Sequence, residues 1–158
     1  MQRRIEVLHN IAIFFQNVFS NRVINAALVA WTLAQVLKVI IELARYKKLN
    51  MRRLFGAGGM PSSHSACICA VASVVCKLKG FDSVEFGLAA IFAFIVIFDA
   101  TSVRRAAGNH AQILNVMMQN EDKQTPELFG RELKEQLGHT PFQALMGILL
   151  GIAVGLVM

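Results

Sequence analysis

The chain has 158 residues, of which 55% are apolar and 16% charged, and its formal net charge is +6. Soluble domains average roughly 45–50% apolar and roughly 25% charged residues, so this composition excludes a disordered chain and disfavours a soluble basic module that binds nucleic acid. The length suits one domain over residues 1–158. Because the apolar residues are concentrated in blocks, we expect a protein of the cell membrane whose main partners are membrane lipids.

The first apolar block follows two cations near the N-terminus. Arg3 and Arg4 precede a stretch from Val7 to Phe19 that is interrupted by Gln16 and Asn17. This stretch is shorter than the roughly 20 residues that cross a bilayer, and no small-residue cleavage site follows it. We therefore expect a helix that lies in the membrane interface or packs on the rest of the protein.

Four later blocks are candidate membrane spans, over residues 23–44, 61–79, 83–99 and 141–158. No alternation typical of strands occurs between them. The sequence therefore predicts an all-α, polytopic membrane helix bundle with four spans and additional interfacial helices. Some of these blocks are short, so we expect them to tilt or to thin the bilayer locally.

The first and last of these spans carry features that bear on packing. Lys38 and Glu42 lie one turn apart in the first, where they could pair inside the bundle; alternatively, Lys38 could extend toward the lipid headgroups. In the last span the glycines recur every four residues, a spacing that allows two membrane helices to approach closely. They are Gly147, Gly151 and Gly155.

The segment 103–138 is polar enough to lie outside the membrane. An amphipathic helix is expected to begin at Val103, and a second helix is expected over 126–137. The second helix has Thr125 as its N-cap, Pro126 at its first position and an acidic residue in its first turn. We expect both helices on the cytoplasmic side.

Charge supports that orientation. If the four spans alternate, one face of the membrane receives five cations and the other receives the segments 45–60 and 100–140, with ten. Cytoplasmic segments carry an excess of Lys and Arg, so the second face is predicted to be cytoplasmic. Its cations are Arg45, Lys47, Lys48, Arg52, Arg53, Arg104, Arg105, Lys123, Arg131 and Lys134.

A glycine- and serine-rich segment on that face opens the second span. Gly59, Ser62, Ser63 and His64 stand where a helix is expected to begin. The free N–H groups and the dipole of a helix N-terminus favour an anion, serine hydroxyls add donors, and an imidazole can give a proton to a leaving oxygen. A simple capping turn with a surface histidine is the alternative reading.

A second histidine stands in a similar place. His139 immediately precedes Thr140-Pro141 at the start of the last span, and Arg104, Arg105 and His110 belong to the same face. Imidazoles, arginines and helix N-termini at one membrane surface suit the binding of a phosphoryl group, whose transfer requires positive charge around its oxygens.

An acidic residue lies close to these arginines. Asp99 ends the third span. It could face water or cap the next helix, or it could pair with Arg104 or orient a catalytic histidine.

These motifs together resemble a known family. Pro-Ser-Ser-His at residues 61–64 is similar to the Pro-Ser-Gly-His motif of the type 2 phosphatidic acid phosphatase and vanadium haloperoxidase superfamily. Gly-Gly-Met-Pro-Ser-Ser-His-Ser-Ala, Val-Arg-Arg-Ala-Ala-Gly and Leu-Gly-His-Thr-Pro resemble, in this order, its divergent membrane branch. The resemblance covers residues 30–158.

The resemblance implies hydrolysis of a lipid-linked phosphate monoester or diphosphate through a phospho-histidine, without a metal ion or another cofactor. It gives His64 the role of general acid and His139 that of the nucleophile. Arg and Lys side chains would hold the phosphate, and the candidates for this role are Arg52, Arg53, Arg104 and Arg105.

The chain departs from the family pattern near its nucleophile. Gln143 occupies the position of the acid that orients the nucleophile, and Thr140-x-x-Gln143 is also a capping box. The family's arginine precedes its histidine at a spacing that Arg104 and His110 reproduce, so His110 is an alternative nucleophile. The alternative function is a non-catalytic membrane protein that binds lipid phosphate or a partner through the same residues. With either function, the chain could form a homo-oligomer.

The charge distribution generates a prediction about topology. A reporter fused at residue 120 should lie in the cytoplasm, because the ten-cation face is predicted to be internal. Accessibility of a single introduced cysteine at that residue to impermeant reagents, in intact and in opened cells, measures this. Labelling in intact cells would contradict the orientation.

Overall fold

The computed structural model describes residues 2–47, 59–120, 133 and 138–158, and no strand occurs among them. The predicted all-α class is therefore confirmed. The elements are α1 (Gln2–Ser20), α2 (Arg22–Tyr46), α3 (Ser63–Lys79), α4 (Val84–Phe98), a π-helical turn η2 (Asp99–Val103), α5 (Arg104–Asn120) and α6 (Pro141–Val157).

The predicted spans correspond to α2, α3, α4 and α6, with ends that differ by a few residues. Two helical stretches, Arg22–Arg45 and Val84–Met118, are long and apolar enough to cross a membrane, and Pro141–Val157 is apolar but shorter. The number of four spans stays a prediction. The helix expected over 126–137 lies outside the described residues, apart from Leu133.

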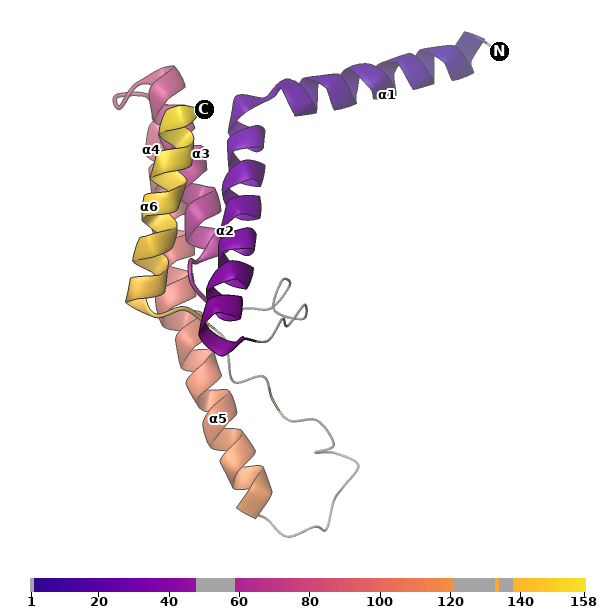
Figure 1. The fold of residues 1–158 in the computed structure, drawn as a ribbon. Helices are drawn as coiled ribbons and strands as arrows, with labels where there is room; N and C mark the ends of the chain where they lie inside the picture. The colour runs from indigo at the N-terminus through magenta and orange to yellow at the C-terminus, as the bar shows by residue number, and fades with distance from the viewer. Residues whose placement is uncertain (1, 48–58, 121–132, 134–137) are drawn as a thin grey trace.

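The largest difference from the expected elements is at Asp99. A span ending there and a separate helix after it were expected, whereas α4, η2 and α5 follow one another without a break, so that α5 extends beyond the bundle (Figure 1). The segment contains no proline or glycine between Leu88 and Ala107 to end the helix. From Asp99 onward the backbone takes the hydrogen-bond register of a π-helix for one turn, but the helix does not end.

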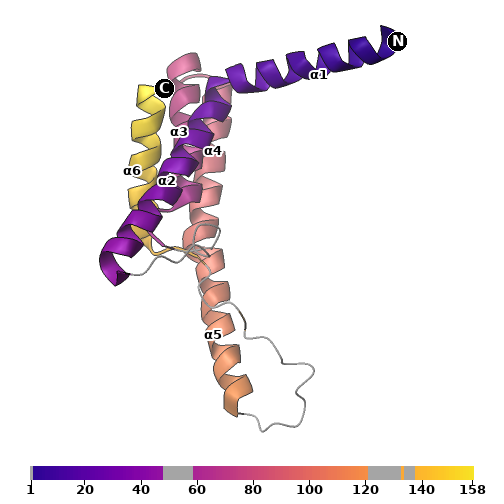
Figure 2. The same cartoon turned by 45° about the vertical axis from the view of Figure 1, so that its right-hand side comes forward.

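Helix α3 is the centre of the bundle. It packs against α2, α4 and α6, and both ribbon views show these helices running side by side (Figures 1 and 2). The beginnings of α3 and α6 lie at the same end as the last turn of α2. The opposite end holds the C-terminus, the α3–α4 connection and the junction of α1 with α2.

The contact between α3 and α6 depends on glycines. Cβ atoms built on Gly147 and Gly151 would overlap the backbone carbonyl oxygens of Ser62 and Ala66, and one built on Gly155 would overlap the side chain of Ser73. The close helix contact predicted from the four-residue glycine spacing is confirmed. We call these three glycines the glycine stripe.

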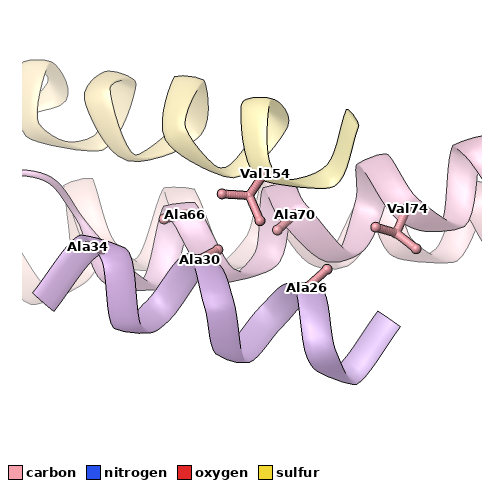
Figure 3. Close-up of a cluster of buried hydrophobic side chains, with 7 residues drawn as sticks. All are labelled: Ala26, Ala30, Ala34, Ala66, Ala70, Val74 and Val154. Carbon is pink, nitrogen blue, oxygen red and sulfur yellow. The ribbon is translucent and has the colours of Figure 1, made fainter. Parts of the chain in front are cut away.

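Small residues also line the contact between α2 and α3. Ala26, Ala30 and Ala34 recur every four residues and are fully buried, so they form one line along α2 (Figure 3). They belong to a buried cluster whose other members are Ala66, Ala70, Val74 and Val154. Large apolar side chains lie on the outside instead, as suits helices surrounded by lipid: Ile91, Phe94, Leu149 and Leu156 are all exposed.

The glycine stripe generates a prediction about stability. Gly151→Ala should destabilise the protein by about 1–3 kcal/mol, because the added methyl group overlaps the backbone of α3. Thermal unfolding in detergent, followed by circular dichroism, measures this.

Gly87→Ala in α4 is the matched control, since nothing lies within 4 Å of a Cβ atom at that position. It should leave stability unchanged or raise it by roughly 0.5–1 kcal/mol through helix propensity. Equal losses in both variants would contradict the packing described for α6.

Candidate active site

Two histidines from distant parts of the sequence lie together at one end of the bundle. The ring centroids of His64 and His139 are 6.4 Å apart, and the ring planes are inclined by 58°. His64 belongs to the first turn of α3, and His139 lies just before Thr140, which caps α6. The glycine stripe brings these two helix starts together, because it allows α3 and α6 to pack closely.

His139 is held through the backbone of the π-helical turn. Its N–H donates to the carbonyl oxygen of Ala100 at 2.9 Å. Ala100 belongs to η2, where the Arg104 N–H donates to the Asp99 carbonyl in the wider register of a π-helix, a feature that is frequent at functional sites. Gly138 has φ +90°, and a Cβ atom there would overlap the backbone of Arg104 and Arg105. The approach of His139 therefore requires glycine before it.

The imidazole of His139 is buried, with only 4% of the residue exposed. Its Nδ1 atom has no hydrogen-bond partner among the described residues. Burial lowers the pKa of His139, and the nearby Lys38 ammonium lowers it further, against smaller opposing contributions from the Gln143 side chain and the Gly59 backbone. A lowered pKa keeps this imidazole neutral near pH 7, the form in which it has a lone pair to attack phosphorus.

Lys38 is a residue of this site whose role does not follow from the family motifs. Only 8% of it is exposed, and its Nζ donates to Ser63 Oγ at 3.2 Å. Of the two environments expected for it, the bundle interior is the one observed. The four-residue spacing from Ala26 to Ala34 continues to Lys38, and this spacing is the signal that would have placed its side chain against α3.

Lys38 also lies near Gly59, which precedes the Pro-Ser-Ser-His motif of residues 61–64. A Cβ atom built on Gly59, which has φ +88°, would come within 3.8 Å of the Lys38 side chain. The Lys38 charge acts on both His64 and His139. The ammonium group therefore belongs to the same site as the two imidazoles.

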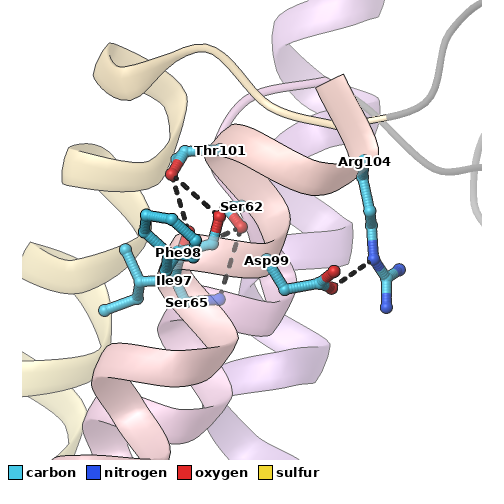
Figure 4. Close-up of polar contacts among 7 residues, drawn as sticks. All are labelled: Ser62, Ser65, Ile97, Phe98, Asp99, Thr101 and Arg104. Atoms are coloured by element: carbon cyan, nitrogen blue, oxygen red, sulfur yellow. Dashed lines mark hydrogen bonds and ion pairs between the residues drawn. The ribbon is translucent and has the colours of Figure 1, made fainter. Parts of the chain in front are cut away.

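Ser62 joins the two helices. Its N–H donates to the carbonyl oxygen of Gln143 at 3.0 Å, and its Oγ accepts from the N–H and the hydroxyl of Ser65 at 3.3 Å and 3.0 Å (Figure 4). The alternative interpretation of this segment is therefore observed in part, because Ser62 caps α3 and His64 is exposed. The Ser63 hydroxyl, in contrast, faces Lys38.

Asp99 and Arg104 form an ion pair. Arg104 Nε lies 2.6 Å from Asp99 Oδ2, and both side chains are partly exposed (Figure 4). Of the roles considered for Asp99, pairing with Arg104 is observed. The charges of both residues act on His64, so the pair borders the site. Arg105, the next residue, is exposed.

The remaining candidates lie apart or outside the described residues. His110 is exposed on α5, which extends beyond the bundle (Figure 1). Arg52 and Arg53 lie outside the described residues. Within the described part of the chain, no three His, Cys, Asp or Glu side chains gather closely enough to hold a metal ion.

The capping box predicted at the start of α6 is confirmed. Thr140 Oγ1 accepts from the Gln143 N–H at 3.3 Å, and Gln143 Oε1 accepts from the Thr140 N–H at 3.0 Å. Gln143, which occupies the position of the family's orienting acid, therefore stabilises the first turn of α6 with its side chain.

Comparisons with known proteins agree with the motifs. The sequence profile of the Divergent PAP2 family matches residues 19–154. The chain is also 41% identical over 143 residues to "Uncharacterized membrane protein YuiD" of Bacillus subtilis (strain 168), which covers 84% of this chain and 90% of that protein. No solved structure matches the chain.

The environment of His139 generates a prediction about its titration. His139 should bind its proton below the ordinary histidine pKa of about 6.5, because burial disfavours the imidazolium. The unfolded chain then binds this proton more tightly than the folded protein does. The free energy of unfolding should therefore decrease as the pH falls below about 6.5.

The ¹⁵N chemical shifts of histidine-labelled protein in micelles, assigned with His139→Gln, measure the titration. The same variant should show a smaller loss of stability on acidification. A His139 midpoint at or above the ordinary value would contradict the buried, neutral imidazole.

Proposed function

Because the chain belongs to the Divergent PAP2 family, we propose that it is a multi-span membrane phosphatase. Its substrate would be a lipid-linked phosphate monoester or diphosphate, hydrolysed at the cytoplasmic interface. The observation that carries this proposal is the meeting of His64, His139 and Lys38 at one end of the bundle. A nucleophile, a proton donor and a positive charge are what phosphoryl transfer requires.

The proposed reaction has two steps. A nitrogen lone pair of His139 attacks phosphorus, a P–N bond forms, and the P–O bond to the lipid breaks while His64 gives a proton to the leaving oxygen. Water then attacks phosphorus and gives a proton to His64, a new P–O bond forms, and the P–N bond breaks. Phosphate is released, and both histidines return to their starting forms. The burial that lowers the pKa of His139 supports its role as the neutral nucleophile.

Three cations support the binding of the phosphoryl oxygens. The buried Lys38 ammonium lies beside Ser63, and Arg104 and Arg105 follow the π-helical turn at the same end of the bundle. Charges that are fixed in place before the reaction stabilise the negative charge of the transition state at little cost in reorganisation. The ion pair with Asp99 fixes Arg104 in this way.

A lipid substrate suits the surroundings of these residues. The outer surface of α4 next to Asp99 is apolar, with Ile95 and Phe98 both more than half exposed. An acyl or isoprenoid chain could remain in the hydrocarbon region along this surface while its phosphate reaches the two histidines.

One observation favours a second function, the binding of lipid phosphate without turnover. Gln143 stands where the family has an acid, and its side-chain oxygen accepts from the Thr140 N–H. An amide stabilises an imidazolium less than a carboxylate does. The same site would then hold the phosphate without hydrolysing it.

The test is phosphate release from a panel of lipid phosphates by detergent-purified protein. His139→Ala should abolish nearly all release, and His64→Ala should lower it by about 10²–10⁴-fold, with a smaller loss for substrates that have good leaving groups. His9→Ala in α1, at the other end of the bundle, is the matched control and should retain activity.

His110→Ala should have a milder effect than His139→Ala. If His110→Ala lost more activity than His139→Ala, His110 would be the nucleophile instead. Gln143→Glu should raise turnover, because the carboxylate stabilises the imidazolium. If no variant releases phosphate while vanadate still binds, the protein is a phosphate-binding one and the phosphatase proposal fails.

A further inference from the structure

The first helix is left unexplained by the candidate site. Helix α1 lies almost wholly outside the residues that the family profile matches, which begin at residue 19. It leaves α2 at the end of the bundle opposite the histidines and runs sideways, away from the other helices, in both ribbon views (Figures 1 and 2). Its role is therefore separate from the chemistry at the other end.

The side chains of α1 divide into two halves. At 100° per residue, one half of the helix is apolar apart from Arg4, and the other half is polar apart from Ile13. The apolar half carries Val7, Ile11, Phe14, Phe15, Val18 and Phe19, and the polar half carries Glu6, His9, Asn10, Gln16, Asn17 and Ser20. The three phenylalanines are each more than half exposed, so the protein itself does not cover this surface.

Hydrogen bonds fix the direction in which α1 leaves the bundle. Asn21 interrupts the helix and caps α2, with its side-chain oxygen accepting from the Val23 and Ile24 N–H groups. Asn25 Nδ2 then donates to the carbonyl oxygen of Phe19 at 2.7 Å. The last turn of α1 is thus tied to the first turn of α2, and the two helices are held transverse to each other.

We propose that α1 lies flat in the membrane interface at the end of the bundle opposite the candidate site. If α2 crosses the bilayer, a helix transverse to its end lies in the membrane plane. The apolar half then faces the acyl chains, and the polar half faces water.

Two observations favour lipid over a protein as the partner of this surface. Ile24 and Leu28, near the beginning of α2, are exposed apolar residues as well, and they face lipid if α2 crosses the bilayer. Arg3, Arg4 and Arg22 also place cations near the two ends of α1, where they can meet lipid phosphates. A second copy of the chain would bring these like charges together instead.

The test uses tryptophan as a depth probe. Trp31 is the one tryptophan of the chain, so Trp31→Phe provides a silent background. Phe15→Trp then reports on the apolar half of α1, and Asn17→Trp, two residues along the helix, is the matched control on the polar half. Both proteins are reconstituted into vesicles of phosphatidylcholine and phosphatidylglycerol, with bromine placed either near the headgroup or near the chain end.

The Phe15→Trp protein should emit at shorter wavelength and lose its fluorescence mainly to the shallow bromines, whereas the Asn17→Trp protein should lose little to either. Equal quenching of both proteins by the deep bromines would overturn the proposal, because α1 would then cross the membrane. The proposal would also be overturned if neither bromine position quenched the Phe15→Trp emission and if this emission shifted with protein density. That result would indicate that a second copy of the chain covers the apolar half of α1. Neither result depends on phosphatase activity.

Discussion

The close approach of α6 to α3 is the constraint from which the other features of the bundle follow. Where Gly147 and Gly151 pack, the neighbouring atoms are the backbone carbonyl oxygens of Ser62, the N-cap of α3, and of Ala66 within it. Any larger side chain would therefore separate the helices. The same approach allows the Ser62 N–H to bond the Gln143 carbonyl, which aligns the beginnings of α3 and α6. Where water does not drive helices together, such packing of small residues is the main source of their association.

Among the described residues, the buried polar side chains of the bundle gather at one end of this small-residue core. Lys38 follows the alanines of α2 in the same line, and His139 lies in the turn that docks onto Ala100. Removing an ammonium group and an imidazole from water is unfavourable, and intramembrane ionisable residues generally mark functional sites. Their placement around Ser63 and His64 is therefore the strongest physical argument that this end of the bundle binds an anion.

Much of this arrangement could be predicted from local sequence. The helical blocks, the capping box at Thr140 and the four-residue spacing of the glycine stripe involve residues close together in the chain, so they are visible directly in the sequence. The partner of Lys38 could not be predicted so readily, because a lysine in a span can pair or extend to the headgroups with similar ease. The π-helical turn at Asp99 was also missed, because a change of hydrogen-bond register has no distinct residue pattern.

The central claim is that the glycine stripe positions the two histidines for an anion, and the affinity for vanadate tests it most directly. Gly147 contacts Ser62 beside the site, whereas Gly155 contacts Ser73 at the far end of the same stripe. Calorimetric titration of detergent-purified proteins should show vanadate binding weakened by about tenfold, or about 1.4 kcal/mol, in Gly147→Ala and unchanged in folded Gly155→Ala. Equal weakening in both variants, or wild-type protein that binds no vanadate, would contradict the account.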